Sequence, residues 1–140
     1  MDDAGRQRWL STVILASVLY LVVGITSATL AASAASDKMR FFWRLAAFTI
    51  SALVFAAHVG YEHFRLRNIT RLTAWHASVG VAFGAFALAL VANIHDLGSA
   101  SGYRPRMLIA LVAWPLLTAV PAFIVALVLA AGLSVKSLRI

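Results

Sequence analysis

The chain has 140 residues, of which 62% are hydrophobic and only 12% are charged. A soluble domain carries about 45–50% apolar and about 25% charged residues, and a chain this short could not bury the excess. The composition therefore excludes an ordinary soluble domain, and the absence of cysteine excludes disulfides and thiolate metal sites. The net charge of +7 comes from short basic clusters at the ends of apolar runs, which favours contact with lipid headgroups over nucleic-acid binding.

Four apolar runs fill the chain almost from end to end, at residues 10–35, 41–64, 72–94 and 107–133. Each run reaches the ~20 residues that a helix needs to cross a bilayer. The sequence therefore predicts an all-α, polytopic integral membrane protein: a single domain, 1–140, of four transmembrane helices in an up-down bundle. Arginine outnumbers lysine and alanine is abundant, which indicates a GC-rich bacterial source and hence an inner membrane.

Basic residues predict the orientation of these helices. With four spans, one side of the membrane collects Arg6, Arg8, Arg65, Arg67, Arg71, Lys136 and Arg139, and the other collects Lys38, Arg40, Arg44, Arg104 and Arg106. The excess of seven over five places both termini in the cytoplasm by the positive-inside rule. The margin is small, so dual topology stays open. We expect Arg44, Arg65, Arg67, Arg71, Trp9 and Trp75 to anchor the helix ends at the headgroups.

A tryptophan near the start of the first run and one near the start of the third stand at the same distance from a later arginine. Trp9 stands 31 residues before Arg40, and Trp75 stands 31 residues before Arg106. This spacing is compatible with two parallel hairpin repeats related by an axis along the membrane normal. The alternative is that every hairpin needs an interfacial tryptophan at its entry and an arginine at its turn.

The second run carries a polar stripe. Arg44, Ser51, His58 and Arg65 recur every seven residues, and Phe48, Phe55 and Glu62 fall between them on the same helical face. Lipid would reject such a stripe, so we expect it to face the other helices. His58 and Glu62 are one turn apart and can contact each other. His58, Glu62, His76 and Ser51 are the predicted polar interior or ligand-binding residues.

The third run places His76, Gly80 and Gly84 on one face. Glycines four residues apart allow another helix to approach closely, so this face predicts a packing seam. The alternative is a flat cofactor lying against Gly80 and Gly84. His58 and His76 fall at similar depths on antiparallel helices, and two imidazoles can bind a haem iron axially. In outline this is similar to small four-helix b-type membrane cytochromes, a similarity that implies haem b and electron transfer.

A divalent metal is a further alternative for the same region. His58, Glu62, His63 and His76 offer the ligand types that zinc or iron prefers. The competing interpretation is that His63 and His76 are ordinary interfacial histidines. In either case, a ligand would lie between the second and third helices, on the side of the termini.

The fourth run contains Pro115 and Pro121, with Thr118 between them. Each proline removes a backbone hydrogen bond, and Thr118 could satisfy a freed carbonyl. Broken helices occur in transporters, but proline is also common in ordinary transmembrane helices.

Three functions remain open from the sequence. The chain has no phosphate-binding glycine loop, nucleophile elbow or paired catalytic carboxylates, so we expect no enzyme and assign no catalytic residue. The first function is a non-catalytic subunit, assembly partner or oligomeric module that contacts copies of itself or other membrane subunits. The second is a b-type cytochrome, and the third is a small transporter or channel.

Overall fold

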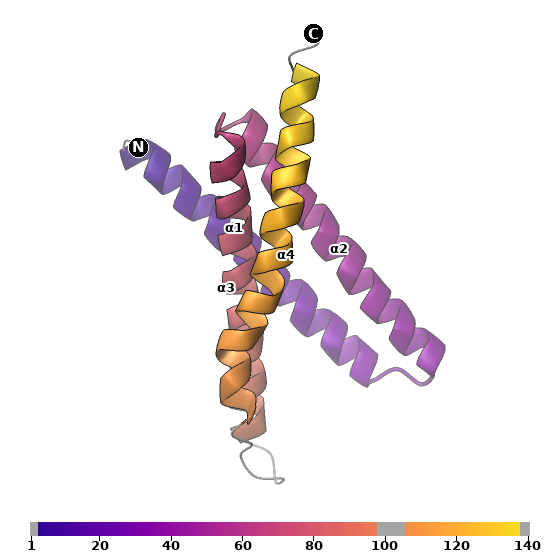
Figure 1. Cartoon of the computed structure of the whole chain (residues 1–140). Helices are drawn as coiled ribbons and strands as arrows, with labels where there is room; N and C mark the ends of the chain where they lie inside the picture. Colours follow the sequence, from indigo (N-terminus) through magenta and orange to yellow (C-terminus); the bar gives the residue numbers. More distant parts are fainter. Residues whose placement is uncertain (1–2, 98–105, 138–140) are drawn as a thin grey trace.

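The computed structural model describes residues 3–97 and 106–137, and this part of the chain consists of four long helices: α1 (Asp3–Ala32), α2 (Asp37–Phe64), α3 (Thr70–Leu97) and α4 (Arg106–Ser137) (Figure 1). Each contains a 28-residue stretch that is long and apolar enough to cross a membrane. The prediction of an all-α chain with four candidate membrane-spanning helices is confirmed.

Most helix ends differ from the ends of the apolar runs, although α2 and its run both end at Phe64. α1 ends at Ala32, three residues before the end of its run, and α3 extends beyond its run at both ends. α2 begins at Asp37 because Ser36 caps it: the Ser36 side chain accepts a hydrogen bond from the Met39 N–H at 3.2 Å. Hydropathy reports where lipid can cover a helix, whereas caps and turns decide where the helix begins and ends.

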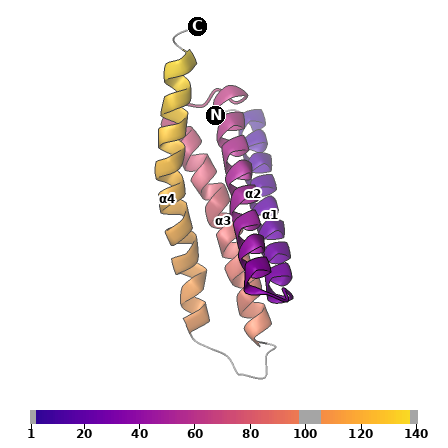
Figure 2. The same cartoon turned by 90° about the vertical axis from the view of Figure 1, so that its right-hand side faces the viewer.

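The helices form two antiparallel hairpins that pack obliquely across each other. Figure 1 shows α3 and α4 side by side along their length, while the hairpin of α1 and α2 crosses them and diverges toward its own turn. In Figure 2 the two hairpins lie as two layers. α1 contacts α2 and α3, and within the described residues it does not contact α4. The N-terminal end of α1 and the C-terminal end of α4 lie at the same end of the molecule.

Small residues fill the interior and large apolar residues cover the outside. The buried cluster is Val59, Ala74, Ala77, Ala126 and Ala130, and Phe55, Phe123 and Leu127 pack against it. Outward-facing side chains include Leu117, which is 69% exposed, and Val128, which is 68% exposed. Small residues let helix backbones approach closely, and a surface of this kind is typical of a protein covered by lipid.

The prediction that the whole polar stripe of α2 faces other helices is wrong for its first half. His58 and Glu62 are buried, but Arg44 is exposed and Phe48 is 73% exposed. The reason is the divergence of the α1–α2 hairpin, which carries the first half of α2 away from α3 and α4 (Figure 1).

Helix α4 stays continuous through Pro115 and Pro121. The prolines leave the carbonyls of Leu111 and Leu117 without their usual helical donors. The Thr118 hydroxyl donates to the carbonyls of Trp114 at 2.9 Å and Pro115 at 3.1 Å, and so does not reach the freed ones. A threonine reaches only the carbonyls three and four residues before it, so its position between the prolines could not serve them.

Candidate functional site

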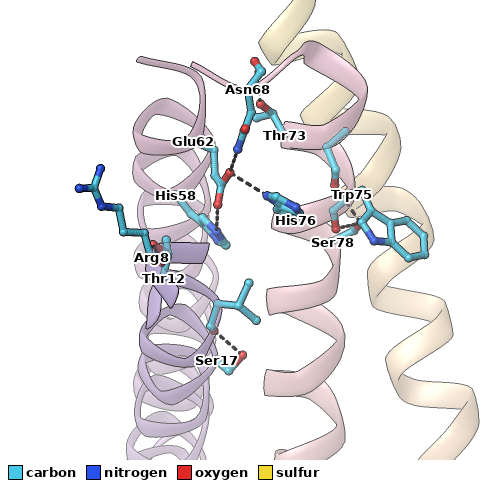
Figure 3. A network of polar contacts seen from close by, with 12 residues as sticks. Arg8, Thr12, Ser17, His58, Glu62, Asn68, Thr73, Trp75, His76 and Ser78 are labelled. Atoms are coloured by element: carbon cyan, nitrogen blue, oxygen red, sulfur yellow. Dashed lines mark hydrogen bonds and ion pairs between the residues drawn. The ribbon is translucent and has the colours of Figure 1, made fainter. Parts of the chain in front are cut away.

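The candidate site lies where the C-terminal end of α2 meets the N-terminal ends of α1 and α3. His58 and Glu62 stand on the last two turns of α2, and both are buried. His76 is on the second turn of α3, four residues before Gly80. Figure 3 shows the three side chains directed toward one another between the helices.

Glu62 is the centre of this cluster, and its side chain has no exposed surface. Its Oε2 lies 2.9 Å from Nδ1 of His76, where the ring N–H donates to the carboxylate. The same oxygen accepts a hydrogen bond from the Asn68 side-chain amide. Its Oε1 lies 3.7 Å from Nε2 of His58, a distance for an ion pair but too long for a hydrogen bond. Three partners from two helices and a loop therefore surround one buried carboxylate, which we call the Glu62 cluster (Glu62, His58, His76 and Asn68).

The loop after α2 is shaped to place Asn68. Arg67 has a positive φ of 52°, which is uncommon for a residue other than glycine. The chain reverses there, and the Asn68 N–H donates to the Glu62 carbonyl at 3.3 Å. Thr73, which is fully buried, donates its hydroxyl to the Asn68 carbonyl at 3.5 Å. The sequence analysis missed Asn68, and the only signal was an amide close to a buried acid.

Trp9 also belongs to this region, although we predicted it as an interfacial anchor. Its ring lies 5.0 Å from that of His76, centroid to centroid, at an interplanar angle of 38°. Trp9 is half-buried, whereas Trp75 is 59% exposed, as an anchor at a helix end would be. α1 therefore places an aromatic side chain beside His76 of the Glu62 cluster. The predicted arginine anchors Arg44, Arg65, Arg67 and Arg71 are all exposed.

Gly80 and Gly84 let α1 and α2 approach α3. A Cβ at Gly80 would lie 3.1 Å from Cε1 of His58, and a Cβ at Gly84 would lie 2.8 Å from Cβ of Tyr20. The Ser17 hydroxyl donates to the Gly80 carbonyl at 3.0 Å. Side chains of α1 and α2 fill this face, so it offers no room for a flat macrocycle. The residues present do not fit a haem between His58 and His76.

The four predicted metal ligands are brought together only in part. His63 packs edge-on against Phe64, with ring centroids 5.0 Å apart and planes at 84°. Within residues 3–97 and 106–137, no three His, Asp or Glu side chains are arranged to hold a metal ion. Ser51 is half-buried, two turns before His58 on α2.

The Glu62 cluster keeps some hydrogen-bonding capacity unused. Both ring nitrogens of His58 and the Oε1 of Glu62 are buried without a hydrogen-bond partner. The contacts of the Glu62 carboxylate join α2, α3 and the loop between them at one end of the molecule. Comparisons with known protein families, curated proteins and solved structures find no match to this chain.

Proposed function

We propose that the chain is an integral protein of a bacterial inner membrane, with four transmembrane helices and both termini in the cytoplasm. Four 28-residue apolar helices support the insertion. The small interior and large apolar exterior support lipid as the surrounding solvent. The excess of basic residues on the side of the termini supports the orientation.

Within the membrane, the protein functions as a non-catalytic module that associates with a second copy of itself. The observation that carries this proposal is the enclosure of Glu62. Glu62, His58 and His76 face one another, and both oxygens of the carboxylate face side chains of the same chain. Such a cluster stabilises the packing of helices, because a polar group surrounded by lipid can form hydrogen bonds only within the protein.

The first half of α2 is the surface that this module offers to a second copy. Phe41, Phe42 and Phe48 are 67%, 55% and 73% exposed where the α1–α2 hairpin diverges from α3 and α4. Arg44 and the half-buried Ser51 lie on the same stripe as Phe48. Polar groups that lipid does not satisfy favour contact with another helix.

Cysteine crosslinking in native membranes tests this association, because the chain has no cysteine of its own. We expect Phe48→Cys to give a disulfide-linked dimer under mild oxidation. Val128→Cys, on the exposed outer face of α4, is the matched control and should stay monomeric. Equal crosslinking at both positions, or none at Phe48→Cys, would contradict the proposal.

A small transporter is the second candidate, and the burial of Glu62 and two histidines within apolar helices favours it. Such residues mark proton and ion pathways in many membrane proteins. In this case, proton flux into liposomes containing the protein should fall when Glu62→Gln replaces the wild type. Flux that matches empty liposomes in the wild type would remove this candidate.

A further inference from the structure

A groove of about 870 Å³ opens between α1 and α2, on the end of the molecule where the termini lie. Its walls are mainly apolar, with Leu15 and Leu19 of α1 facing Val54 and Ala57 of α2, and Ser11 and Thr12 line it nearer the mouth. The ring of His58 lines its inner side, with both ring nitrogens covered. The volume lies within the range of about 300–1,000 Å³ that is usual for ligand-binding clefts.

The groove has the depth of one membrane leaflet. The α1 residues that line it run from Gln7 to Leu19, and the rise from Arg8 to Leu19 is about 17 Å. Half of the hydrocarbon layer of a bilayer is about 15 Å thick. An occupant would therefore begin at the headgroup level and end near the middle of the membrane. A transmembrane helix of a partner would continue beyond that point, whereas an acyl chain would not.

The mouth of the groove carries hydrogen-bond donors and a positive charge. Arg8 and Gln7 of α1 and Tyr61 of α2 line it there, and all three are exposed. No carboxylate among the described side chains lies within ion-pair distance of Arg8. A guanidinium with two neutral donors beside it is complementary to a phosphate, which offers several acceptor oxygens.

We propose that this groove binds one anionic phospholipid of the surrounding membrane. One acyl chain lies along Leu15, Leu19 and Val54, and the phosphate is bound by Arg8, with Gln7 and Tyr61 as further donors. The proposal rests on the membrane insertion proposed above. It adds a specific lipid site to a surface that is otherwise covered by exchanging lipids.

Native mass spectrometry of the detergent-purified protein tests the site, with phosphatidylglycerol and phosphatidylcholine of identical acyl chains as probes. The wild type should retain one phosphatidylglycerol in preference to phosphatidylcholine. Arg8→Gln should weaken phosphatidylglycerol binding about tenfold, the loss expected from one charge-assisted hydrogen bond, and should abolish the preference. Arg65→Gln is its control, because Arg65 is an exposed arginine at the same end but outside the groove.

A second pair of variants tests the position of the acyl chain. Ala57→Phe fills the groove and should reduce retention of both lipids, while Ala56→Phe, at the exposed neighbouring residue outside the groove, should leave retention unchanged. Neither alanine is buried, so both variants should fold. Retention in Ala57→Phe equal to the wild type would overturn the proposal, as would equal losses in Arg8→Gln and Arg65→Gln. A purified protein that needs no detergent would overturn the membrane insertion instead.

Discussion

Glu62 is a carboxylate with no exposed surface, and its burial carries an electrostatic cost. A carboxylate removed from water is stable only when charges or hydrogen-bond donors replace the lost hydration. Asn68 and His76 supply those donors to Oε2, and His58 lies beside Oε1. Arg67 holds a positive φ so that Asn68 can reach back to the carboxylate, a local strain of about 1 kcal/mol or more. The local strain at Arg67 therefore accompanies a hydrogen bond to Oε2, while Oε1 has only the nearby His58 ring.

Removing the Glu62 side chain should destabilise the protein strongly. Glu62→Ala leaves two imidazoles and an amide without their shared partner, and breaking a buried pair of this kind costs about 3–5 kcal/mol. Glu62→Gln keeps the shape and one acceptor oxygen, so its effect should be smaller. The measurement is the free energy of unfolding by SDS in mixed micelles. Thr49→Ala, at an exposed position of α2, is the control, and a Glu62→Ala variant as stable as this control would contradict the role of the cluster.

The sequence predicted the contacts of this site that lie within one helix, but not those that depend on the loop or on helix crossing. His58 and Glu62 are four residues apart on one helix, so their proximity follows from helical geometry alone. His76 was placed at a similar depth by counting residues from the helix ends. Asn68 depends on the backbone reversal at Arg67, and Trp9 depends on how α1 crosses α3. Neither the reversal nor the crossing leaves a periodic pattern in the chain.

Helix α3 packs against each of the other three helices, and its small residues permit this. Its buried residues include Ala74, Ala77, Gly80, Gly84 and Ala89. Lipid provides no hydrophobic driving force between helices, so their association depends on dispersion contacts, and close backbone approach increases these. The Gly80–Gly84 spacing indicated such a seam in advance. The divergence of α2 could not be predicted, because its stripe has the same period in its exposed and buried halves.

Close packing at Gly84 and open space at Gly132 predict different effects for the two glycine-to-alanine substitutions. Gly84→Ala places a Cβ 2.8 Å from Cβ of Tyr20 and 3.4 Å from the Ser17 carbonyl oxygen, so α1 and α3 must separate. We expect a loss of about 1–3 kcal/mol in the free energy of unfolding. Gly132→Ala meets no atom within 4 Å and should be neutral or stabilising by up to about 1 kcal/mol through helix propensity. SDS unfolding compares them, and equal effects would show that the seam is not closely packed.

At the scale of the whole molecule, packing within the α3–α4 hairpin differs from packing between the two hairpins. α3 and α4 pack along their length, whereas α1 crosses α3 obliquely, from Trp9 beside His76 to Gly24 beside Leu88. The sequence predicted the four helices and their alternating direction, because apolar length and short connections determine both. It could not predict the oblique packing of one hairpin on the other, which depends on which small residues meet across the interface.

Thiol labelling of single-cysteine variants tests the orientation of the whole chain. Ala35→Cys lies in the turn between α1 and α2, and Arg65→Cys lies at the opposite end of α2. A membrane-impermeant maleimide added to intact spheroplasts should label Ala35→Cys and should label Arg65→Cys only after permeabilisation. The reverse pattern would invert the orientation, and partial labelling of both would indicate dual topology.

The order of the cluster residues along the chain has a consequence for biosynthesis. N-terminal segments emerge from the ribosome first, so α2 enters the bilayer with His58 beside Glu62 but without His76, which follows 14 residues after the acid. Until α3 arrives, the acid has His58 on its own helix and Asn68 in the loop that follows, but it lacks the His76 imidazole. The nascent first hairpin is thus an incomplete intermediate. A chain truncated after Phe64 should integrate less stably into the membrane and should be degraded faster by membrane proteases.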